Sequence, residues 1–190
     1  TEDGTYYYTL GRAASTYSMT TVVCKWQISD GAQQACNSSS VRYGIALTYY
    51  DGEVFVLQGG STSTSYRKAI ILDASNLAAT GETVDYYSGV SSYSFAHDID
   101  ADEDNGDIYI AYRDYYGRVR AYEEQPDGNY CATSSCYSQY YAYTRYHQNV
   151  DVIGDKAYTT GYYSSSYAGG LRHADTGTKV VTSMWTSYGD

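Results

Sequence analysis

The sequence predicts an all-β protein, and three observations support this class. Runs of about four to eight residues rich in Val, Ile, Tyr and Thr recur between Gly, Asp and Asn turns, whereas helical periodicity is nearly absent. A turn followed by a strand also repeats, and the aromatic residue in its middle falls at Tyr7, Phe55, Tyr109 and Tyr158, in steps of 48, 54 and 49 residues. A period near 50 residues made only of strands is typical of propeller blades. We therefore expect a β-propeller-like fold of about four antiparallel blades.

The strands of each blade can be placed in chain order around these turns. The four blades are expected over residues 1–40, 41–94, 95–146 and 147–190, as a single domain. In the last three blades a first strand precedes the turn, at 44–47, 98–101 and 149–152. A third strand follows at 67–72, 118–122 and 170–173, and a weaker fourth at 82–87, 137–143 and 179–185. A β-sandwich is the competing fold, because strand counting alone does not separate it from a small propeller.

The first blade lacks an inner strand in this reading, because its recognisable strands are 6–10, 21–27 and a short piece near Cys36. An unpaired strand edge recruits a strand from elsewhere. The segment 180–186, VVTSMWT, is a good β sequence and one candidate partner for this edge, either within one chain or in the next chain of a filament. A longer parent protein is the remaining source, since the chain reads as a mature protein or an excised portion of a longer one.

Charge and hydropathy exclude two classes of partner. The chain of 190 residues has 12 Lys and Arg against 22 Asp and Glu, a formal charge of −10, which opposes binding to nucleic acid and to anionic membranes. The longest aliphatic run, AIIL at residues 69–72, is far below the roughly 20 residues that cross a bilayer. We expect neither nucleic-acid binding nor membrane insertion.

Tyrosine dominates the aromatic residues, with 27 Tyr against 2 Phe and 2 Trp. A chain that needed rings only for its core would use Phe, so many of these rings are expected where the hydroxyl meets water or a polar partner. Exposed aromatic patches favour association with copies of the same chain or with sugars. The residues expected on this contact surface are Tyr49, Tyr50, Tyr86, Tyr87, Tyr115, Tyr116, Tyr162 and Tyr163. Packing of rings between neighbouring blades is the alternative for part of them.

Four cysteines form two close pairs, Cys24 with Cys36 and Cys131 with Cys136. Such spacings suit local disulfides in an oxidising compartment, and no pair shows the short spacing of a zinc site, although reduced buried thiols remain an alternative. Asn37 begins an Asn-Ser-Ser acceptor for N-glycosylation beside Cys36. Both features predict a secreted, extracellular protein.

The segment DIDADEDNGD, residues 98–107, is the sharpest local signal of chemistry. Alternate carboxylates on a strand lie on one face, so Asp100, Asp102 and Asp104 are candidate oxygen ligands for calcium, the only cofactor the sequence suggests. The spacing departs from a helix-flanked calcium loop, because the Gly falls one residue late and no Glu closes the loop. A solvated strand followed by a hairpin turn is the alternative.

Catalytic motifs are absent from the sequence: it has no nucleophile elbow, phosphate-binding loop or His-Glu-x-x-His pair. Asp98, Asp100 and Asp151 on inner strands are able to converge near His97 and His147, and paired carboxylates are what glycoside hydrolysis needs. Acids at a propeller's inner rim are also common as solvated strand ends. We expect no catalysis, with a glycoside-active enzyme as the distant alternative.

Residues 43–60, YGIALTYYDGEVFVLQGG, resemble the extracellular β-propeller repeats of bacterial and protist surface proteins, in which a strand like Ile-Ala-Leu precedes Asp-Gly and a Val-Tyr-Val strand. The resemblance covers about three quarters of the chain and implies only the fold, because such repeats serve adhesion, scaffolding and glycan binding as well as enzymes. It supplies no catalytic residue.

These features predict a non-catalytic extracellular structural protein, a subunit of a filament, sheath or surface appendage. Tyr with Ser and Thr gives rigid contact area at a low cost in side-chain entropy, which suits self-assembly through repeated contacts between subunits. A secreted glycan-binding or adhesion module is the alternative, since it would use the same rings.

Overall fold

The structure is a computed structural model. It describes residues 1–12, 20–59, 68–86, 95–113, 117–125, 130, 137–141, 146–163, 168–176 and 181–187. All regular elements in these ranges are strands. None of the described residues belongs to a helix long and apolar enough to cross a membrane.

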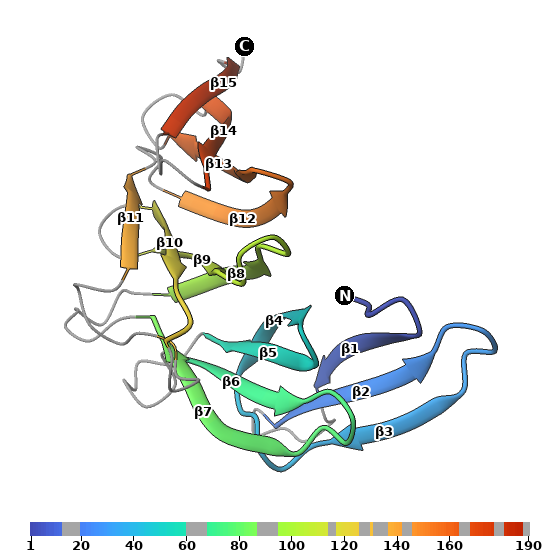
Figure 1. The fold of residues 1–190 in the computed structure, drawn as a ribbon. Helices are drawn as coiled ribbons and strands as arrows, with labels where there is room; N and C mark the ends of the chain where they lie inside the picture. Colours follow the sequence, from blue (N-terminus) through green and yellow to red (C-terminus); the bar gives the residue numbers. More distant parts are fainter. Residues whose placement is uncertain are drawn as a thin grey trace.

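Fifteen strands form four antiparallel sheets, each built from consecutive strands (Figure 1). The first sheet contains β1 (Tyr6–Arg12), β2 (Thr21–Gln27) and β3 (Gln33–Asn37). The second contains β4 (Gly44–Tyr50), β5 (Glu53–Gln58), β6 (Lys68–Asp73) and β7 (Ala79–Asp85). The third contains β8 (Phe95–Ala101), β9 (Ile108–Arg113), β10 (Gly117–Tyr122) and β11 (Tyr137–Tyr141). The fourth contains β12 (Tyr146–Ile153), β13 (Lys156–Tyr163), β14 (Ala168–Asp175) and β15 (Val181–Ser187).

The predicted all-β, propeller-like class is confirmed, with one sheet for each repeat and only three strands in the first. Local turns explain the repeat. Asp51 and Gly52 join β4 to β5 with φ angles of 42° and 84°, the two positive values that a two-residue hairpin turn requires. The β-sandwich alternative is wrong, because a sandwich packs two sheets whereas this chain forms four.

The sheets follow one another along an open arc, with the first sheet (blue) at one end and the fourth (orange to red) at the other (Figure 1). Neighbouring sheets touch through their innermost strands, since β4 contacts β8 and β8 contacts β12. Residues 181–186 do not reach β1 within the chain, because they belong to β15, which pairs with β14. Of the two alternatives for this segment, ring closure within one chain is therefore wrong.

The inner side of β1 is paired only near the start of the strand. Glu2 forms a bridge with Tyr7, and the backbone N–H of Tyr8 donates to Thr1 O at 2.8 Å. Among the described residues, no strand other than β2 forms a ladder with β1.

Side chains that alternate along each strand fill the spaces between sheets. Each sheet has two sides. We call the side turned toward the beginning of the arc the preceding side and the side turned toward its end the following side, so an inner sheet packs on its neighbours through both. Tyr8 packs between the first and second sheets, Phe55 between the second and third, and Tyr109 between the third and fourth. All three rings are on following sides.

The expected equivalence of four aromatic rings holds for three of them. Phe55, Tyr109 and Tyr158 lie on the following sides of their sheets, because the residues beside them in sequence, such as Val54 and Ala157, contact the preceding sheet. Tyr7 is the exception, and the prediction for it is wrong: Tyr8 is on the following side instead. Because side chains alternate with a period of two, an offset of one residue after the Asp3-Gly4 turn moves the ring to the opposite side.

Candidate functional site

Among the described residues, the two ends of the arc each leave one side of a sheet without a neighbouring sheet. At the beginning of the arc this is the preceding side of the first sheet. Strand register puts Tyr7 opposite Trp26, Thr9 opposite Cys24, and Gly11 opposite Val22. We call the surface formed by Tyr7, Thr9, Val22, Cys24 and Trp26 the first-sheet end face.

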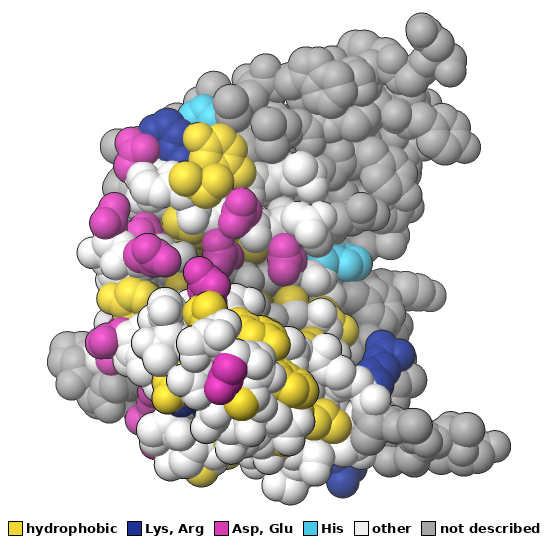
Figure 2. Space-filling model, turned by 90° about the vertical axis from the view of Figure 1, so that its right-hand side faces the viewer, with side chains coloured by type: hydrophobic (Ala, Val, Ile, Leu, Met, Phe, Trp, Pro, Cys, Tyr) yellow, Lys and Arg dark blue, Asp and Glu magenta, His cyan; other side chains and the backbone are white. Residues whose placement is uncertain are grey.

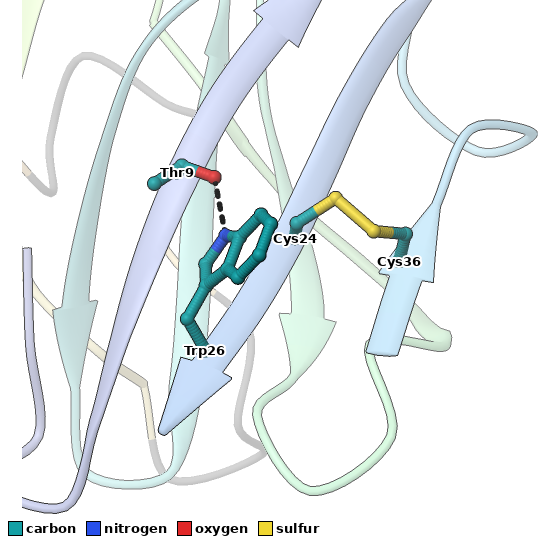
Figure 3. Close-up of a disulfide and its surroundings, with 4 residues drawn as sticks. All are labelled: Thr9, Cys24, Trp26 and Cys36. Carbon is teal, nitrogen blue, oxygen red and sulfur yellow. Dashed lines mark hydrogen bonds between the residues drawn. A yellow bond between two sulfur atoms is a disulfide. The ribbon is translucent and has the colours of Figure 1, made fainter. Parts of the chain in front are cut away.

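An aromatic pair and a disulfide order this face, and Figure 3 shows Trp26 with Thr9 beside the disulfide. The rings of Tyr7 and Trp26 stack with centroids 6.2 Å apart and planes 9° from parallel. The indole N–H of Trp26 donates to Thr9 Oγ1 at 2.9 Å, which fixes the orientation of the ring. Cys24 is bonded to Cys36 on β3, with their Cα atoms 4.1 Å apart. The predicted Cys24–Cys36 disulfide is confirmed, whereas Cys131 and Cys136 lie outside the described residues.

Comparison with the inner sheets shows what is unusual about the first-sheet end face. The preceding sides of the second and third sheets carry Val54, Val56, Ile108 and Ile110, and all four side chains are 0% exposed. In the first sheet the corresponding strand has Tyr7, which is half-buried, and Thr9, which is exposed. Positions that are core in the inner sheets are therefore surface in the first.

The other end of the arc is the following side of the fourth sheet. Strand register forms two rows of neighbouring side chains on this side. Each row crosses β12, β13 and β14, and the rows are Asp151, Tyr158 and His173, and Ile153, Lys156 and Asp175. We call this set the fourth-sheet end face. The Tyr158 and His173 rings lie 5.9 Å apart, and Ile153 is 61% exposed, an unusual exposure for a large apolar side chain.

Carboxylates on β8 join the third sheet to its neighbours. Asp98 Oδ2 accepts from the backbone N–H of Val150 at 3.1 Å, and Asp100 Oδ2 accepts from that of Val152 at 2.7 Å. Thr48 Oγ1 donates to Asp100 Oδ1 at 3.0 Å, so this carboxylate bridges β4 and β12. Burial raises the pKa of both carboxyls, while these hydrogen bonds oppose the rise.

The structure thus gives Asp98 and Asp100 a role between strands. Of the other groups expected at the inner rim, Asp151 and His97 are exposed, and the His147 side chain lies outside the described part. The two buried carboxylates bind backbone N–H groups of β12, and this arrangement joins strands rather than presenting a free acid pair.

The three carboxylates proposed as calcium ligands lie in different surroundings and make different contacts. Asp100 bridges strands, Asp102 is buried with Oδ1 accepting from Asp104 N at 3.0 Å, and Asp104 is exposed in the turn. Within the described ranges no three His, Cys, Asp or Glu side chains are grouped as metal ligands. The calcium site stays a prediction without support from the geometry.

The predicted tyrosine surface is described only in part. Tyr49 and Tyr50 are half-buried, and Tyr49 stacks on Tyr8 with centroids 5.7 Å apart. For Tyr86 the prediction is wrong: the side chain is 1% exposed, and its hydroxyl donates to Gln58 O at 3.0 Å, so a polar partner exists inside the core. The remaining side chains lie outside the described residues: Tyr87, Tyr115, Tyr116, Tyr162 and Tyr163.

The nitrogen of Asn37 that would carry a glycan is engaged in the structure. Asn37 Nδ2 donates to Leu77 O at 2.6 Å and to Ser40 Oγ at 3.2 Å. Asn37 Oδ1 accepts from Ser39 N at 2.9 Å. Glycosylation of this side chain stays a prediction, and it would require displacement of one of these contacts.

The first-sheet end face was not predicted as a site from the sequence, although one signal for it existed. Val22, Cys24 and Trp26 alternate along a strand, so they share a face, and the Cys on that face was predicted to be bonded to another strand. On the opposite face, Lys25 was also missed: it is 8% exposed, donates to Ala74 O at 2.8 Å, and lies 3.9 Å from the centroid of the Tyr6 ring.

The excess of Asp and Glu over Lys and Arg in the sequence is visible on the surface of the protein. In Figure 2, acidic side chains gather in a band across the middle of the face, whereas Lys and Arg lie at its margins. This distribution gives phosphate no basic patch on the face shown.

No protein-family model matches the chain, and no curated protein matches it. Solved structures are similar in fold. One is hydrazine synthase of Kuenenia stuttgartiensis, with a TM-score of 0.65 and 8% identity over 95% of this chain and 52% of that one. Another is U3-55K, with a TM-score of 0.58 and 9% identity over 94% of this chain and 54% of that one. The WD40 repeats of RRP9 are similar at a TM-score of 0.57 and 9% identity, with the same coverage of 94% and 54%.

These similarities show a β-propeller type of fold and, at such low identity, nothing about activity. The chain spans about half the length of the solved structures that it matches.

Proposed function

We propose that this chain is a non-catalytic extracellular structural protein, a subunit of a filament, sheath or surface appendage that self-assembles through aromatic and apolar surfaces. The observation that carries the proposal is the pair of end faces, on which side chains of the type buried between the inner sheets are partly or largely exposed. Monomeric proteins rarely leave such surfaces uncovered. Association between copies would bury them.

Two further features support an extracellular setting. Cys24 and Cys36 form a disulfide. Disulfides form and persist in oxidising compartments and are rare in reducing ones. The resemblance of residues 43–60 to repeats of extracellular surface proteins points to the same setting, and it stays part of the proposal.

The test is sedimentation velocity of the purified chain from micromolar to millimolar concentration, followed by negative-stain electron microscopy. We expect species that grow with concentration and form fibres or sheets. A chain that stays monomeric throughout this range, with no assembled particles on the grid, would contradict the proposal.

Glycan binding is the second candidate function, and one observation favours it. The stacked rings of Tyr7 and Trp26 form a partly exposed aromatic pair beside a hydroxyl, a surface with apolar area and an adjacent polar group. A glycan array separates the two candidates. Selective binding that is lost in Trp26→Ala, in a chain that sediments as a monomer, would establish this second function instead.

A further inference from the structure

We propose that the fourth-sheet end face of one copy packs on the first-sheet end face of the next, so that sheet-on-sheet packing continues from one chain into another. The inference rests on the proposed self-assembly and adds which surfaces meet and in which direction.

The junctions inside the chain have a common composition. Between the second and third sheets, Phe55 on the following side lies against a sheet that presents Ile108 and Ile110. Between the third and fourth sheets, Tyr109 on the following side lies against a sheet that presents Ala157. Each junction therefore joins a ring from one sheet to smaller apolar side chains from the next.

The end faces occupy the two corresponding sides of such a junction, one following and one preceding, although the first-sheet end face carries the Tyr7 and Trp26 rings where the inner sheets carry smaller apolar side chains. Tyr158 is the counterpart of Phe55 and Tyr109 on the following side of the fourth sheet, where Ile153 is 61% exposed beside it. Tyr7 and Thr9 are the counterparts of Val54 and Val56 on the preceding side of the first sheet. Because the two end faces differ, the contact they favour is head-to-tail rather than symmetric.

A polar group of the inner junction is repeated at the end of the arc. Asp100 pairs across its hairpin with Tyr109 and binds the backbone N–H of Val152 in the next sheet. Asp151 pairs across its hairpin with Tyr158 in the same way, and its side chain is exposed. The donor in the inner junction belongs to β12, the innermost strand of its sheet, and the described part of the first sheet has no strand in that place, so the inference assigns no partner to Asp151.

The test uses substitutions at exposed positions, which leave the core of the chain intact. Thr9→Glu places a charge on the first-sheet end face, and Ile153→Glu places one on the fourth-sheet end face. Thr80→Glu is the matched control, because Thr80 is also an exposed strand threonine with a hydroxyl that accepts a hydrogen bond, but it lies on β7, outside both faces. Circular dichroism verifies that each variant keeps its strands.

Sedimentation equilibrium then measures self-association. We expect each end-face substitution to weaken it at least about tenfold, since a charge buried without a partner is costly at an interface, and the control to change it less than about twofold. A mixture of the Thr9→Glu and Ile153→Glu chains provides the decisive measurement. The Thr9→Glu chain keeps an unchanged fourth-sheet end face, and the Ile153→Glu chain keeps an unchanged first-sheet end face. The mixture should therefore form a dimer and nothing larger.

The possible results separate this inference from the proposed function. Assembly of the wild-type chain that both substitutions leave unchanged would overturn the inference alone. A mixture that fails to dimerise would overturn the head-to-tail direction. A discrete wild-type dimer, of twice 21.0 kDa, that is lost in both variants would support the inference as a closed ring and contradict the filament. A wild-type monomer would overturn both proposals.

Discussion

Asp100 on β8 accepts a hydrogen bond from the backbone N–H of Val152 on β12, so a side chain of the third sheet occupies a backbone donor of the fourth. Thr48 on β4 donates to the same carboxylate. One residue thereby holds the inner strands of three sheets together.

Removal of this carboxylate should loosen the arc. Asp100→Ala leaves the Val152 N–H and the Thr48 hydroxyl without this acceptor, and we expect a loss of about 1 to 3 kcal/mol in the free energy of unfolding. Asp100→Asn keeps an acceptor oxygen and should lose less. Urea denaturation measures both, with Asp104→Ala in the exposed turn as the control. Equal losses for Asp100→Ala and the control would contradict the bridging role.

Glu53 should make the fold less stable as the pH rises. Burial, and then the negative charges of Glu82 and Glu124, raise the pKa of Glu53 to about 7 in the folded chain. Because the folded state holds this proton more tightly than the unfolded state does, the contribution is present at low pH and is lost as the pH rises from about 4.5 to about 7. After allowance for solvent screening, we expect the free energy of unfolding to fall by about 1 kcal/mol over this pH range.

The substitution Glu53→Gln isolates this effect. The variant should be more stable than the wild type at pH 8 and should lose that advantage at pH 4.5. Urea midpoints at the two values measure the difference, and Glu103→Gln at an exposed position serves as the reference. An advantage of the same size at both pH values would show that charge is not the cause.

Lys25 should stabilise the contact between the first and second sheets. Its ammonium group donates to Ala74 O and lies over the Tyr6 ring, so Lys25→Ala loses a buried hydrogen bond and a cation–π contact. We expect Lys25→Ala to lower the free energy of unfolding by about 2 kcal/mol. Tyr6→Leu keeps the apolar contact but removes the π face, and it should cost less. A thermal-denaturation midpoint unchanged in Lys25→Ala would contradict this role.

Asn37 should act structurally even where no glycan is attached. Asn37→Ala removes the hydrogen bonds to Leu77 O and from Ser39 N, and we expect a loss of about 1 to 2 kcal/mol in unglycosylated protein. Ser39→Ala destroys the acceptor sequence for glycosylation but keeps the Asn37 side chain, so it should be nearly neutral in the same protein. If the two variants are equally stable, Asn37 has no structural role; a mass shift on the secreted wild-type chain tests the glycan separately.

Local sequence was sufficient to predict the sheets. Pairs such as Asp51-Gly52 specify tight turns, and alternating apolar residues beside them specify strands, so both signals lie within a few residues of each other. The predicted side of the sheet for Tyr7 was wrong, because an offset of one residue in a turn moves every following side chain to the opposite side of the strand. That offset depends on how the turn closes, which composition does not determine.

The roles of individual polar side chains were harder to predict, because their partners lie far away in sequence. Asp98 and Asp100 stand in a run of acids that suggests a metal site, yet they accept from backbone N–H groups of β12, 52 residues along the chain, and Asp100 also accepts from Thr48 on β4. Lys25 reads as a surface residue between Cys24 and Trp26, and only the packing of the second sheet on the first buries it. The openness of the arc is also a collective property, since small rotations between successive sheets decide whether a ring closes.

The consecutive order of strands within every sheet has a consequence for how the chain acquires its structure. Each sheet pairs only segments that are close in sequence, so each pairing closes a short loop and carries a small entropic penalty. A sheet emerging from the ribosome can fold before the next one is synthesised and then serve as its template, as in repeat proteins. In the part of the chain that the structure describes, β15 pairs only with β14, so none of these strand pairings needs a segment from the other end of the arc.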